Sequence, residues 1–321
     1  MVIITLKQIR LGDMLKLAKT DLWVSQLCLG TNVFGWSIDQ SQSFQVLDAY
    51  LDMGGNFLDT ADNYSQWKPG NTGGESETII GNWLSSRGNR SKVVLASKVA
   101  KLSSRRGLSP DNIRAALEET LKRLQTDYLD IYYSHEDDFN VPTQQTLYCY
   151  TQLIKEGKIR YIAASQHSAE RLAQALLISK QENLASYIAL QDHYNLMARQ
   201  PFEGTQMQVV LDNQISALPF YGLAKGFLTG KYRKGVAVES VRAQSVAEYF
   251  TPTGWRVLDR LSDIANKYQV SIAAVALAWL RANPAVSTPI ASATTTAQLA
   301  EIMQNVELSV QDIADLNLAS A

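Results

Sequence analysis

The sequence predicts a closed barrel of eight parallel β-strands, each followed by an α-helix. Three observations lead to this fold class. Strand-like apolar runs alternate with helical segments about eight times along the 321 residues, with short connections, as in a parallel sheet covered by helices. Polar side chains stand where successive strands end, which in a barrel is the rim of one mouth. No GxGxxG and no Walker A motif occurs, which argues against an open, doubly wound sheet.

The N-terminal part of the chain can form a β-hairpin followed by the first barrel strand. Residues 2–6 and 14–17 alternate apolar and polar side chains, and residues 22–30 alternate as well and end in a glycine, which is the pattern of a strand. We therefore predict one (β/α)8 domain over residues 1–321. Residues 1–30 would supply the hairpin, the barrel floor and the first strand, and extra helices are expected near the C-terminus.

The other elements follow in a regular order. Ser109 and Pro110 start one helix as an N-cap and a proline at the first helical position, and Gly157 stops another. Residues 93–98 form the continuous apolar run expected of a strand covered on both faces. Predicted strands are 57–58, 93–98, 128–134, 161–165, 187–191, 215–220 and 286–290. Predicted helices are 41–53, 75–84, 110–124, 143–155, 169–179, 202–211, 254–268, 271–282 and 297–306.

Composition and charge exclude several classes of function. The net charge is −1, so a basic surface for nucleic acid or for an anionic membrane is not expected. No run of 18 or more apolar residues is present, as a membrane span would require. The apolar stretch at residues 1–7 is too short for a signal peptide. We therefore expect a cytoplasmic protein whose partner is a small molecule, with no nucleic acid and no membrane.

Cysteine and histidine content argues against a disulfide framework and against a metal site. Cys28 and Cys149 stand in apolar contexts and form no CxxC motif. The three histidines show neither HxxxH nor HxxH spacing, so no typical set of zinc ligands is present. A bound metal is therefore not expected. The histidines are His135, His167 and His193.

Four side chains at predicted strand ends form a set that can protonate an oxygen atom. Asp59 ends the strand at 57–58, and Tyr64 follows in the next loop. Lys98 and His135 stand at the ends of two later strands. A phenol has a pKa of roughly 10, and a neighbouring ammonium makes loss of its proton easier. A carboxylate can hold that ammonium, and an imidazole can orient a substrate oxygen. This is the chemistry of carbonyl reduction, in which a cofactor supplies the hydride.

Five stretches of the chain resemble the motifs of aldo-keto reductases, and the resemblance extends from about residue 14 to residue 308. They are residues 24–35, 56–64, 95–98, 130–135 and 218–232. The family folds as a (β/α)8 barrel and reduces aldehydes or ketones to alcohols, so the resemblance implies the same fold and activity here. It also implies that the family's catalytic tetrad falls on Asp59, Tyr64, Lys98 and His135, with Tyr64 as the general acid.

The resemblance further implies NADP(H) extended across the barrel mouth, without a Rossmann fold. The nicotinamide carboxamide would meet Ser165 and Gln191, and its ring would stack on Phe220 or on Tyr221. The floor near the nicotinamide would be formed by Gly30, Thr31, Asn32 and Asp59. The pyrophosphate would lie beside Gly222, Leu223 and Lys225, under a clamp of Lys231 and Arg242. The adenosine end would meet Ser292, Thr294, Gln298 and Glu301.

Departures from the family pattern bear on the cofactor. Gln166 stands where asparagine is usual, and residues 221–222 replace a common Ser-Pro. No Lys or Arg occurs after residue 282, although positive charge or bidentate donors normally meet the 2′-phosphate of NADPH. The expected cofactor is NADP(H), with NAD(H) as the alternative.

Aromatic residues near the mouth are expected to wall the substrate pocket, since large aromatic surfaces suit apolar aldehydes and ketones. These are Trp36, Trp67 and Tyr194, and His135 is expected to touch the substrate as well. The acidic residues near the mouth are expected to be solvated loop charges. These are Asp62, Glu136, Asp137 and Asp138.

Three alternative functions stay open at this point. Some relatives of the family serve as nucleotide-binding regulatory subunits of membrane channels. The tetrad also works in reverse, so a sugar or polyol dehydrogenase is a second alternative. Tyr64 and Lys68 spell the YxxxK pair of short-chain dehydrogenases, although Pro69 and Gly70 interrupt the helix that this pair needs. No heptad or apolar stripe predicts an oligomeric state.

Overall fold

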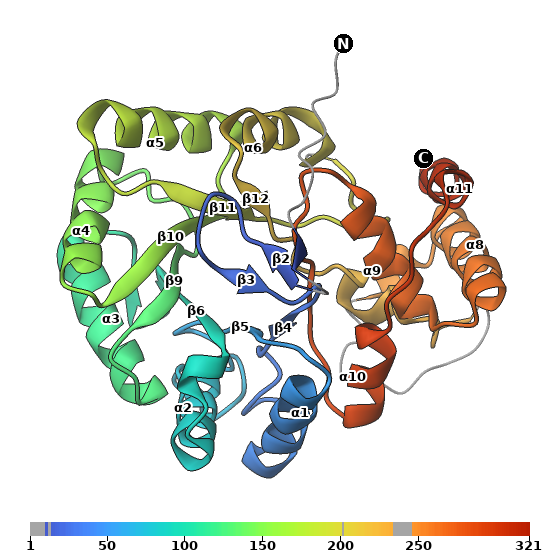
Figure 1. The fold of residues 1–321 in the computed structure, drawn as a ribbon, viewed down its shortest axis with the longest axis horizontal. Helices are drawn as coiled ribbons and strands as arrows, with labels where there is room; N and C mark the ends of the chain where they lie inside the picture. The colour runs from blue at the N-terminus through green and yellow to red at the C-terminus, as the bar shows by residue number, and fades with distance from the viewer. Residues whose placement is uncertain (1–9, 12–13, 201, 234–245) are drawn as a thin grey trace.

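The computed structural model describes residues 10–11, 14–200, 202–233 and 246–321. Within this part of the chain, eight strands form a parallel sheet that curls into a barrel, with helices around its outside (Figure 1). Neighbouring strands follow the order β12-β11-β10-β9-β6-β5-β4-β13. Their bounds are Cys28–Gly30 (β4), Phe57–Asp59 (β5), Val94–Val99 (β6), Leu129–Ser134 (β9), Ile159–Ser165 (β10), Tyr187–Gln191 (β11), Ser216–Ala217 (β12) and Ile290–Ala291 (β13). The predicted (β/α)8 fold class is confirmed.

Backbone hydrogen bonds close the barrel between the two ends of this strand order. The amide of Ala217 in β12 donates to the carbonyl of Ala285 at 2.8 Å, and Ser287 donates back to Ala217 at 3.0 Å. Ile290 donates to Pro219 at 2.8 Å. These bonds join the β12 segment to the residues before β13, so both strands have a partner on either side.

Helices cover the outside of the barrel (Figure 1), and a large apolar cluster fills the layer between them and the strands. Ser109 and Pro110 start α3 as predicted, since the serine side chain accepts a hydrogen bond from Asn112. The helices are Gln40–Asp52 (α1), Glu75–Arg87 (α2), Pro110–Leu124 (α3), Thr143–Lys155 (α4), Ala169–Glu182 (α5), Met207–Asn213 (α6), Pro252–Tyr268 (α8), Ile272–Ala282 (α9), Thr296–Met303 (α10) and Val310–Ala319 (α11). Shorter helical turns are Arg90–Lys92, Phe202–Gln206, Ala224–Thr229 and Ala247–Tyr249.

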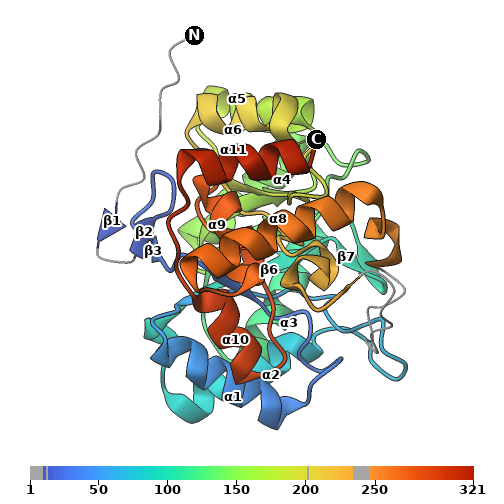
Figure 2. The same ribbon diagram turned by 90° about the vertical axis from the view of Figure 1, so that its right-hand side faces the viewer.

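A small antiparallel sheet covers the floor of the barrel. Its strands are Arg10–Leu11 (β1), Met14–Lys16 (β2) and Trp23–Val24 (β3). Its apolar side chains pack against inward-facing residues of the barrel, including Phe57 and Ile131; they are Leu15, Leu17, Leu22 and Val24. Figure 2 shows this sheet at one end of the barrel. At the other end lies the hairpin of β7 (Lys101–Leu102) and β8 (Arg105–Arg106), which follows β6. Residues 2–6, the predicted partner of 14–17, lie outside the described residues.

The strand predicted over residues 22–30 is two strands. The Ser25 hydroxyl donates to the carbonyl of Leu27 at 2.8 Å, and its amide donates to the Asn56 side chain at 2.8 Å. These bonds bend the chain, so β3 joins the floor sheet and β4 enters the barrel. The predicted strands at 215–220 and 286–290 are also shorter than expected.

Two helical segments differ from the prediction as well. The helix expected over residues 202–211 is interrupted at Gly204, whose ψ of −127° is not helical, and α6 begins only after it. Helix α11 is one of the extra helices expected near the C-terminus, although its bounds were not predicted. Ser309 and Asp312 form a capping box at its start, a signal that is readable in the sequence.

No helix in the described part of the chain combines the length and the apolar character needed to cross a membrane. Cys28 and Cys149 are both buried free thiols. Among the described residues, no group of three or more His, Cys, Asp or Glu side chains is arranged to hold a metal ion.

Removing one floor side chain should destabilise the whole barrel. Leu17 is 0% exposed within the floor cluster, so Leu17→Ala should lower the free energy of unfolding by about 2–5 kcal/mol, because it opens a cavity. Urea denaturation followed by tryptophan fluorescence measures this change. Leu318→Ala is the matched control, since Leu318 is 75% exposed. Equal effects of the two substitutions would show that the floor sheet does not contribute to the core.

Candidate active site

The carboxylate of Asp59, at the C-terminal end of β5, is the acceptor around which the candidate site is built. The Lys98 ammonium donates to its Oδ2 at 2.6 Å, and the Tyr64 hydroxyl donates to the same oxygen at 3.2 Å. The Gln191 amide, at the end of β11, donates to Oδ1 at 2.9 Å. Since β5, β6 and β11 all end at this mouth, the barrel brings these side chains together from distant parts of the chain.

Lys98 is completely buried, and each of its hydrogen-bond partners lies at the mouth. Besides Asp59, its Nζ donates to the carbonyl of Thr60 at 2.7 Å and to the Tyr64 hydroxyl at 2.8 Å. The loop that carries Tyr64 is itself held in place, because the Ser65 hydroxyl donates to the carbonyl of Phe34 at 2.6 Å. The predicted triad of carboxylate, ammonium and phenol is therefore assembled in hydrogen-bonding contact.

The phenol of Tyr64 is not acidified in the way the sequence predicted. Burial, followed by the charge and hydrogen bond of Asp59, raises the pKa of Tyr64 well above its usual 10. Burial also lowers the pKa of Lys98, although Asp59 opposes this shift. Burial is the larger cause, and Asp59 adds to it because its carboxylate accepts from both groups, so the phenol lies beside a neutralised ion pair and not beside a bare ammonium. Tyr64 consequently keeps its proton at neutral pH, as a proton donor must.

His135 follows β9 and lies beside the phenol. The centroids of its ring and the Tyr64 ring are 6.0 Å apart. Burial, together with the positive charges of Lys98 and Lys101, lowers the pKa of His135 well below 6.5, so the imidazole is neutral at pH 7. Its Nδ1 has no hydrogen-bond partner among the described residues. A neutral imidazole at this position can hydrogen-bond the oxygen of a bound substrate.

The predicted nicotinamide-binding residues fall into two groups. The Ser165 hydroxyl, at the end of β10, is buried and lacks a hydrogen-bond partner within the described chain, so it can accept an amide ligand. Gln191 and Thr31 form the second group, because their side chains already make hydrogen bonds within the protein. The Gln191 amide donates to the Asp59 carboxylate, and the Thr31 hydroxyl donates to the carbonyl of Asp59 at 2.9 Å. Thr31 and Gln191 therefore support the site from within the protein.

Aromatic rings gather at the rim beyond β11. Phe220 stacks on His193 with ring centroids 5.7 Å apart, and Tyr221 packs edge-on against Phe220 at 5.1 Å. Tyr221 is exposed, and Phe220 already stacks on the ring of His193. Phe220 and Tyr221 both remain candidates to stack on the nicotinamide ring. Lys225 was predicted to lie beside the pyrophosphate. Its ammonium forms an ion pair with Glu248 at 2.7 Å.

The remaining predicted cofactor residues are spread over several segments of the chain. Ser292 donates to the Asn32 side chain at 2.8 Å, which joins the segment after β13 to the one after β4. Thr294 donates to Gln298 through both its amide and its hydroxyl. The Lys231 Nζ lies 5.1 Å from the centroid of the Tyr232 ring. Glu301 is exposed, and the buried members of the set are Gly30, Gly222 and Leu223. Arg242 lies outside the described residues.

Of the three predicted pocket aromatics, Trp67 stands beside the phenol and Trp36 packs against Trp67. Trp67 is 6.3 Å from Tyr64 and 5.6 Å from Trp36 between ring centroids. Tyr194 does not face the mouth: it is 1% exposed and packs on Phe202 and Trp279 within the core. The prediction for Tyr194 was therefore wrong, because a core aromatic and a pocket aromatic look the same in sequence.

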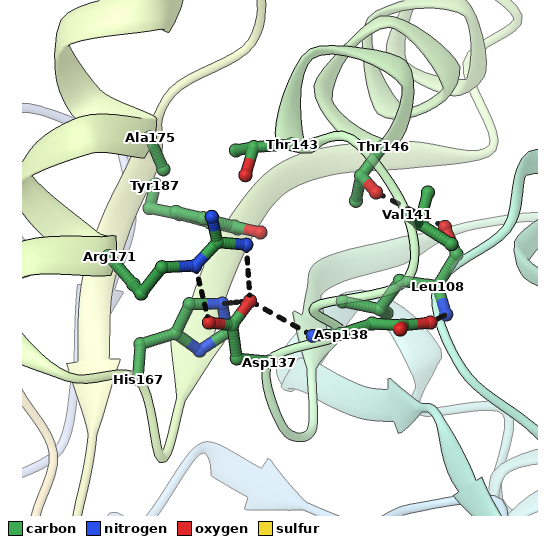
Figure 3. A pocket seen from close by; sticks show the side chains of 10 residues that line it. All are labelled: Leu108, Asp137, Asp138, Val141, Thr143, Thr146, His167, Arg171, Ala175 and Tyr187. Carbon is green, nitrogen blue, oxygen red and sulfur yellow. Dashed lines mark hydrogen bonds and ion pairs between the residues drawn. The ribbon is translucent and has the colours of Figure 1, made fainter.

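The loop after His135 is anchored to the outer helices. Asp137 accepts from two nitrogens of Arg171 in α5, at 2.6 and 2.9 Å (Figure 3). The Asp138 carboxylate accepts from the amide of Leu108 at 2.8 Å. The His167 Nε2 lies 3.8 Å from the Asp137 Oδ1 (Figure 3), and these residues line a cavity of about 10 Å³, room for roughly one water molecule. Asp137 and Asp138 are thus structural anchors and not the solvated charges that the sequence predicted.

Asp62 is a buried carboxyl group, also contrary to the sequence prediction. It is 1% exposed, and neither oxygen has a hydrogen-bond partner in the described residues. Burial and the nearby Glu77 raise the pKa of Asp62 to about 8, against the opposing charge of Arg123. Arg123 is committed to Glu77, to which its Nε donates at 2.6 Å. Asp62 therefore stays protonated at neutral pH.

Asp62→Asn should flatten the dependence of stability on pH. Folded Asp62 keeps its proton to about pH 8, while an unfolded aspartate loses it near 3.8. The folded state therefore binds more protons between these values, and the free energy of unfolding falls as pH rises from about 4 to about 8. The fall amounts to several kcal/mol, because a tenfold difference in proton affinity corresponds to about 1.4 kcal/mol.

Urea denaturation of both proteins at pH 4.5 and pH 8 checks this expectation. The Asp62→Asn variant, whose amide does not titrate, should gain stability relative to the wild type at the higher pH only. The exposed Asp52, near the end of α1, offers a matched control as Asp52→Asn. A stability change of equal size at both pH values would mean that Asp62 is ionised in the folded state.

Comparison with known proteins agrees with this fold. Residues 26–320 match the model of the Aldo/keto reductase family. The chain is 34% identical to the uncharacterized oxidoreductase YrpG of Bacillus subtilis, over 92% of this chain and 91% of the relative. It is 31% identical to protein tas of Escherichia coli, over 92% and 94% of the two chains. It is also 31% identical to a probable voltage-gated potassium channel subunit beta of Oryza sativa, over 91% and 90%.

The family match extends over nearly the whole described barrel, and the relatives align over nine-tenths of their own length. The expectation drawn from the five sequence motifs is thereby confirmed: the chain belongs to the aldo/keto reductase family.

Proposed function

We propose that this protein reduces aldehydes or ketones to alcohols with NADP(H) as the hydride donor. The observation that supports this most strongly is the shared contact of three groups, with the Tyr64 hydroxyl 2.8 Å from the Lys98 ammonium and both donating to Asp59. This arrangement presents one protonated phenol to a substrate oxygen. The partner is accordingly a small carbonyl compound.

Each residue of the site has a distinct role in this proposal. Nicotinamide, when bound, supplies the hydride that attacks the carbonyl carbon. Tyr64 transfers its proton to the carbonyl oxygen as negative charge develops there, and in the oxidative direction it takes the proton back. Lys98 stabilises the phenolate that remains, while Asp59 keeps Lys98 charged despite its burial. The neutral His135 hydrogen-bonds the same oxygen and orients it.

The residues present suit a nicotinamide nucleotide. The Ser165 hydroxyl at the strand end has no hydrogen-bond partner in the described part of the chain, so it offers one to the carboxamide. Phe220 or Tyr221 offers the nicotinamide ring a stacking surface. NADP(H) is favoured because Lys231, or Arg242 as a further candidate, would add positive charge near the phosphates, whereas the charge of Lys225 is already paired with Glu248. NAD(H) remains the alternative, because no Lys or Arg follows residue 282.

A second candidate function is a nucleotide-binding regulatory subunit. It is favoured by one observation, the similarity to relatives named as probable potassium channel subunits beta in Oryza sativa and Arabidopsis thaliana. The two functions differ in turnover. A protein that binds NADPH tightly, but oxidises it with none of a panel of carbonyl compounds, would have the regulatory role.

Tyr64→Phe should abolish carbonyl reduction and leave cofactor binding intact, because it removes the proton and keeps the ring. Loss of a general acid lowers kcat by about 10²–10⁴-fold. Loss of NADPH absorbance with a panel of aldehydes and ketones measures the rate. Tyr148→Phe is the control, since Tyr148 is 58% exposed on α4.

Binding must be measured separately from turnover. Quenching of tryptophan fluorescence by NADPH and by NADH gives both affinities for the wild type and for Tyr64→Phe, and their ratio decides the cofactor preference. If Tyr64→Phe reduces carbonyl compounds at the wild-type rate, then Tyr64 is not the proton donor and the proposed mechanism is wrong.

A further inference from the structure

An ion pair that the proposed mechanism does not use stands at the rim of the mouth. Lys101 lies in β7, three residues beyond Lys98, and Glu136 directly follows His135. The Lys101 Nζ and the Glu136 Oε2 are 3.6 Å apart. The pair therefore bridges the two segments that leave the barrel immediately after Lys98 and His135, next to the place where a substrate carbonyl would lie.

Glu136 compensates the charge of Lys101 only in part. The Lys101 side chain is 20% exposed and that of Glu136 is 37% exposed, so the cation is the more buried partner. Their separation exceeds the roughly 2.7–2.9 Å of a charge-assisted hydrogen bond. Burial lowers the pKa of Lys101, and the attraction of Glu136 opposes this shift. A partly desolvated ammonium in such a position gains from a closer anion.

The surroundings of Lys101 are positively charged and well anchored. Arg106 lies opposite Lys101 in the register of β7 and β8, and its charge is among the causes that lower the pKa of Lys101. Gln66, on the loop of Tyr64, accepts from the amide of Ser103 at 3.1 Å and donates to the carbonyl of Lys101 at 3.5 Å. The β7–β8 hairpin is thus tied to the loop that carries the proton donor.

Lys101 also lies within electrostatic reach of the catalytic groups. Its charge is one of the causes that lower the pKa of His135, and the charge of Lys98 in turn acts on Lys101. Because Lys101 follows the strand end of Lys98 and its ion-pair partner Glu136 directly follows His135, a substrate whose carbonyl oxygen meets Tyr64 and His135 can place a second group near the Lys101 ammonium. An anionic group there would take the place of Glu136.

We propose that Lys101 forms an anion-binding subsite of the candidate active site, and that the preferred substrates are aldehydes or ketones that carry a carboxylate. This inference rests on the proposed reductase function and specifies its substrate class. The substrate carboxylate accepts a hydrogen bond from the Lys101 Nζ, and Glu136 turns toward solvent, where it is already the more exposed partner.

Two measurements on the full-length protein test the subsite. The first is the ratio of kcat/KM for 4-carboxybenzaldehyde to that for its neutral methyl ester. The second is the calorimetric Kd of benzoate, which requires no turnover, in the presence of NADP⁺. The variants are Lys101→Met, Lys101→Arg and Glu136→Gln. Lys68→Met is the control, because Lys68 is an exposed lysine on the Tyr64 loop whose ammonium lies 3.4 Å from the carbonyl of Gly35.

Lys101→Met should lower the kcat/KM ratio and weaken benzoate binding, each by about tenfold or more, as expected for loss of a charged hydrogen bond. Lys101→Arg should retain most of the kcat/KM ratio and most of the affinity for benzoate. Glu136→Gln should raise the kcat/KM ratio and the affinity for benzoate, because it removes the competing carboxylate. Lys68→Met should change neither quantity.

The outcomes separate this inference from the proposed function. If neither aldehyde is reduced while benzoate binding still depends on Lys101, the reductase function is wrong and the anion subsite stands. If Lys101→Met lowers kcat/KM equally for the acid and the ester, or leaves the Kd of benzoate unchanged, the subsite does not exist. In the latter cases, reduction of the neutral ester by the wild type would leave the proposed function intact.

Discussion

The buried ammonium of Lys98 needs a counter-charge, and the carboxylate of Asp59 supplies it. A charged lysine with no exposed surface is costly unless it is paired and hydrogen-bonded, and Asp59 lies 2.6 Å away. The same oxygen also accepts a hydrogen bond from the Tyr64 hydroxyl. The buried phenol therefore lies beside an ion pair without net charge, and it keeps its proton. The proton can leave only when a stronger base forms beside it, and in carbonyl reduction that base is the developing alkoxide. Burial and the Asp59 carboxylate together thus set the resting protonation state, and the same carboxylate supports the proposed chemistry.

The barrel supplies the precision that this pair requires. Asp59, Lys98 and Gln191 stand at the ends of three different strands, where the backbone is held by hydrogen bonds on both sides. The loops between are fixed by side-chain anchors, such as the contact of Asp137 with Arg171. Groups that would select the substrate lie further out, on the loop of Trp67 and the hairpin of Lys101. In this architecture, catalytic groups usually stand on rigid strand ends and the groups that select the substrate stand on loops.

Much of the fold and the central part of the site were predictable from the sequence, because both depend on local patterns. Strand and helix periodicity predicts the barrel, and the residues after each strand predict Asp59, Lys98 and His135 at one mouth. The errors depend on contacts between distant residues. The bend at Ser25 requires Asn56, which is 31 positions away. Besides burial, the pKa of Asp62 depends on Glu77 from α2, which raises it, and on Arg123 from α3, which lowers it. Tyr194 was misplaced because only packing against Phe202 and Trp279 shows it to be a core residue. Burial and the Asp59 carboxylate together raise the pKa of Tyr64, and the spacing of residues reveals neither the burial nor the contact with Asp59.

The protonation state of Tyr64 tests this account most directly. In protein labelled with [¹³Cζ]tyrosine, the Tyr64 resonance is identified by its absence from Tyr64→Phe and followed as the pH is raised. The account predicts that Tyr64 in the wild type remains protonated through pH 10, the usual pKa of a phenol, and that Asp59→Asn lowers its pKa. Deprotonation of Tyr64 in the wild type below pH 10, or an unchanged pKa in Asp59→Asn, would contradict the central role assigned to the Asp59 carboxylate.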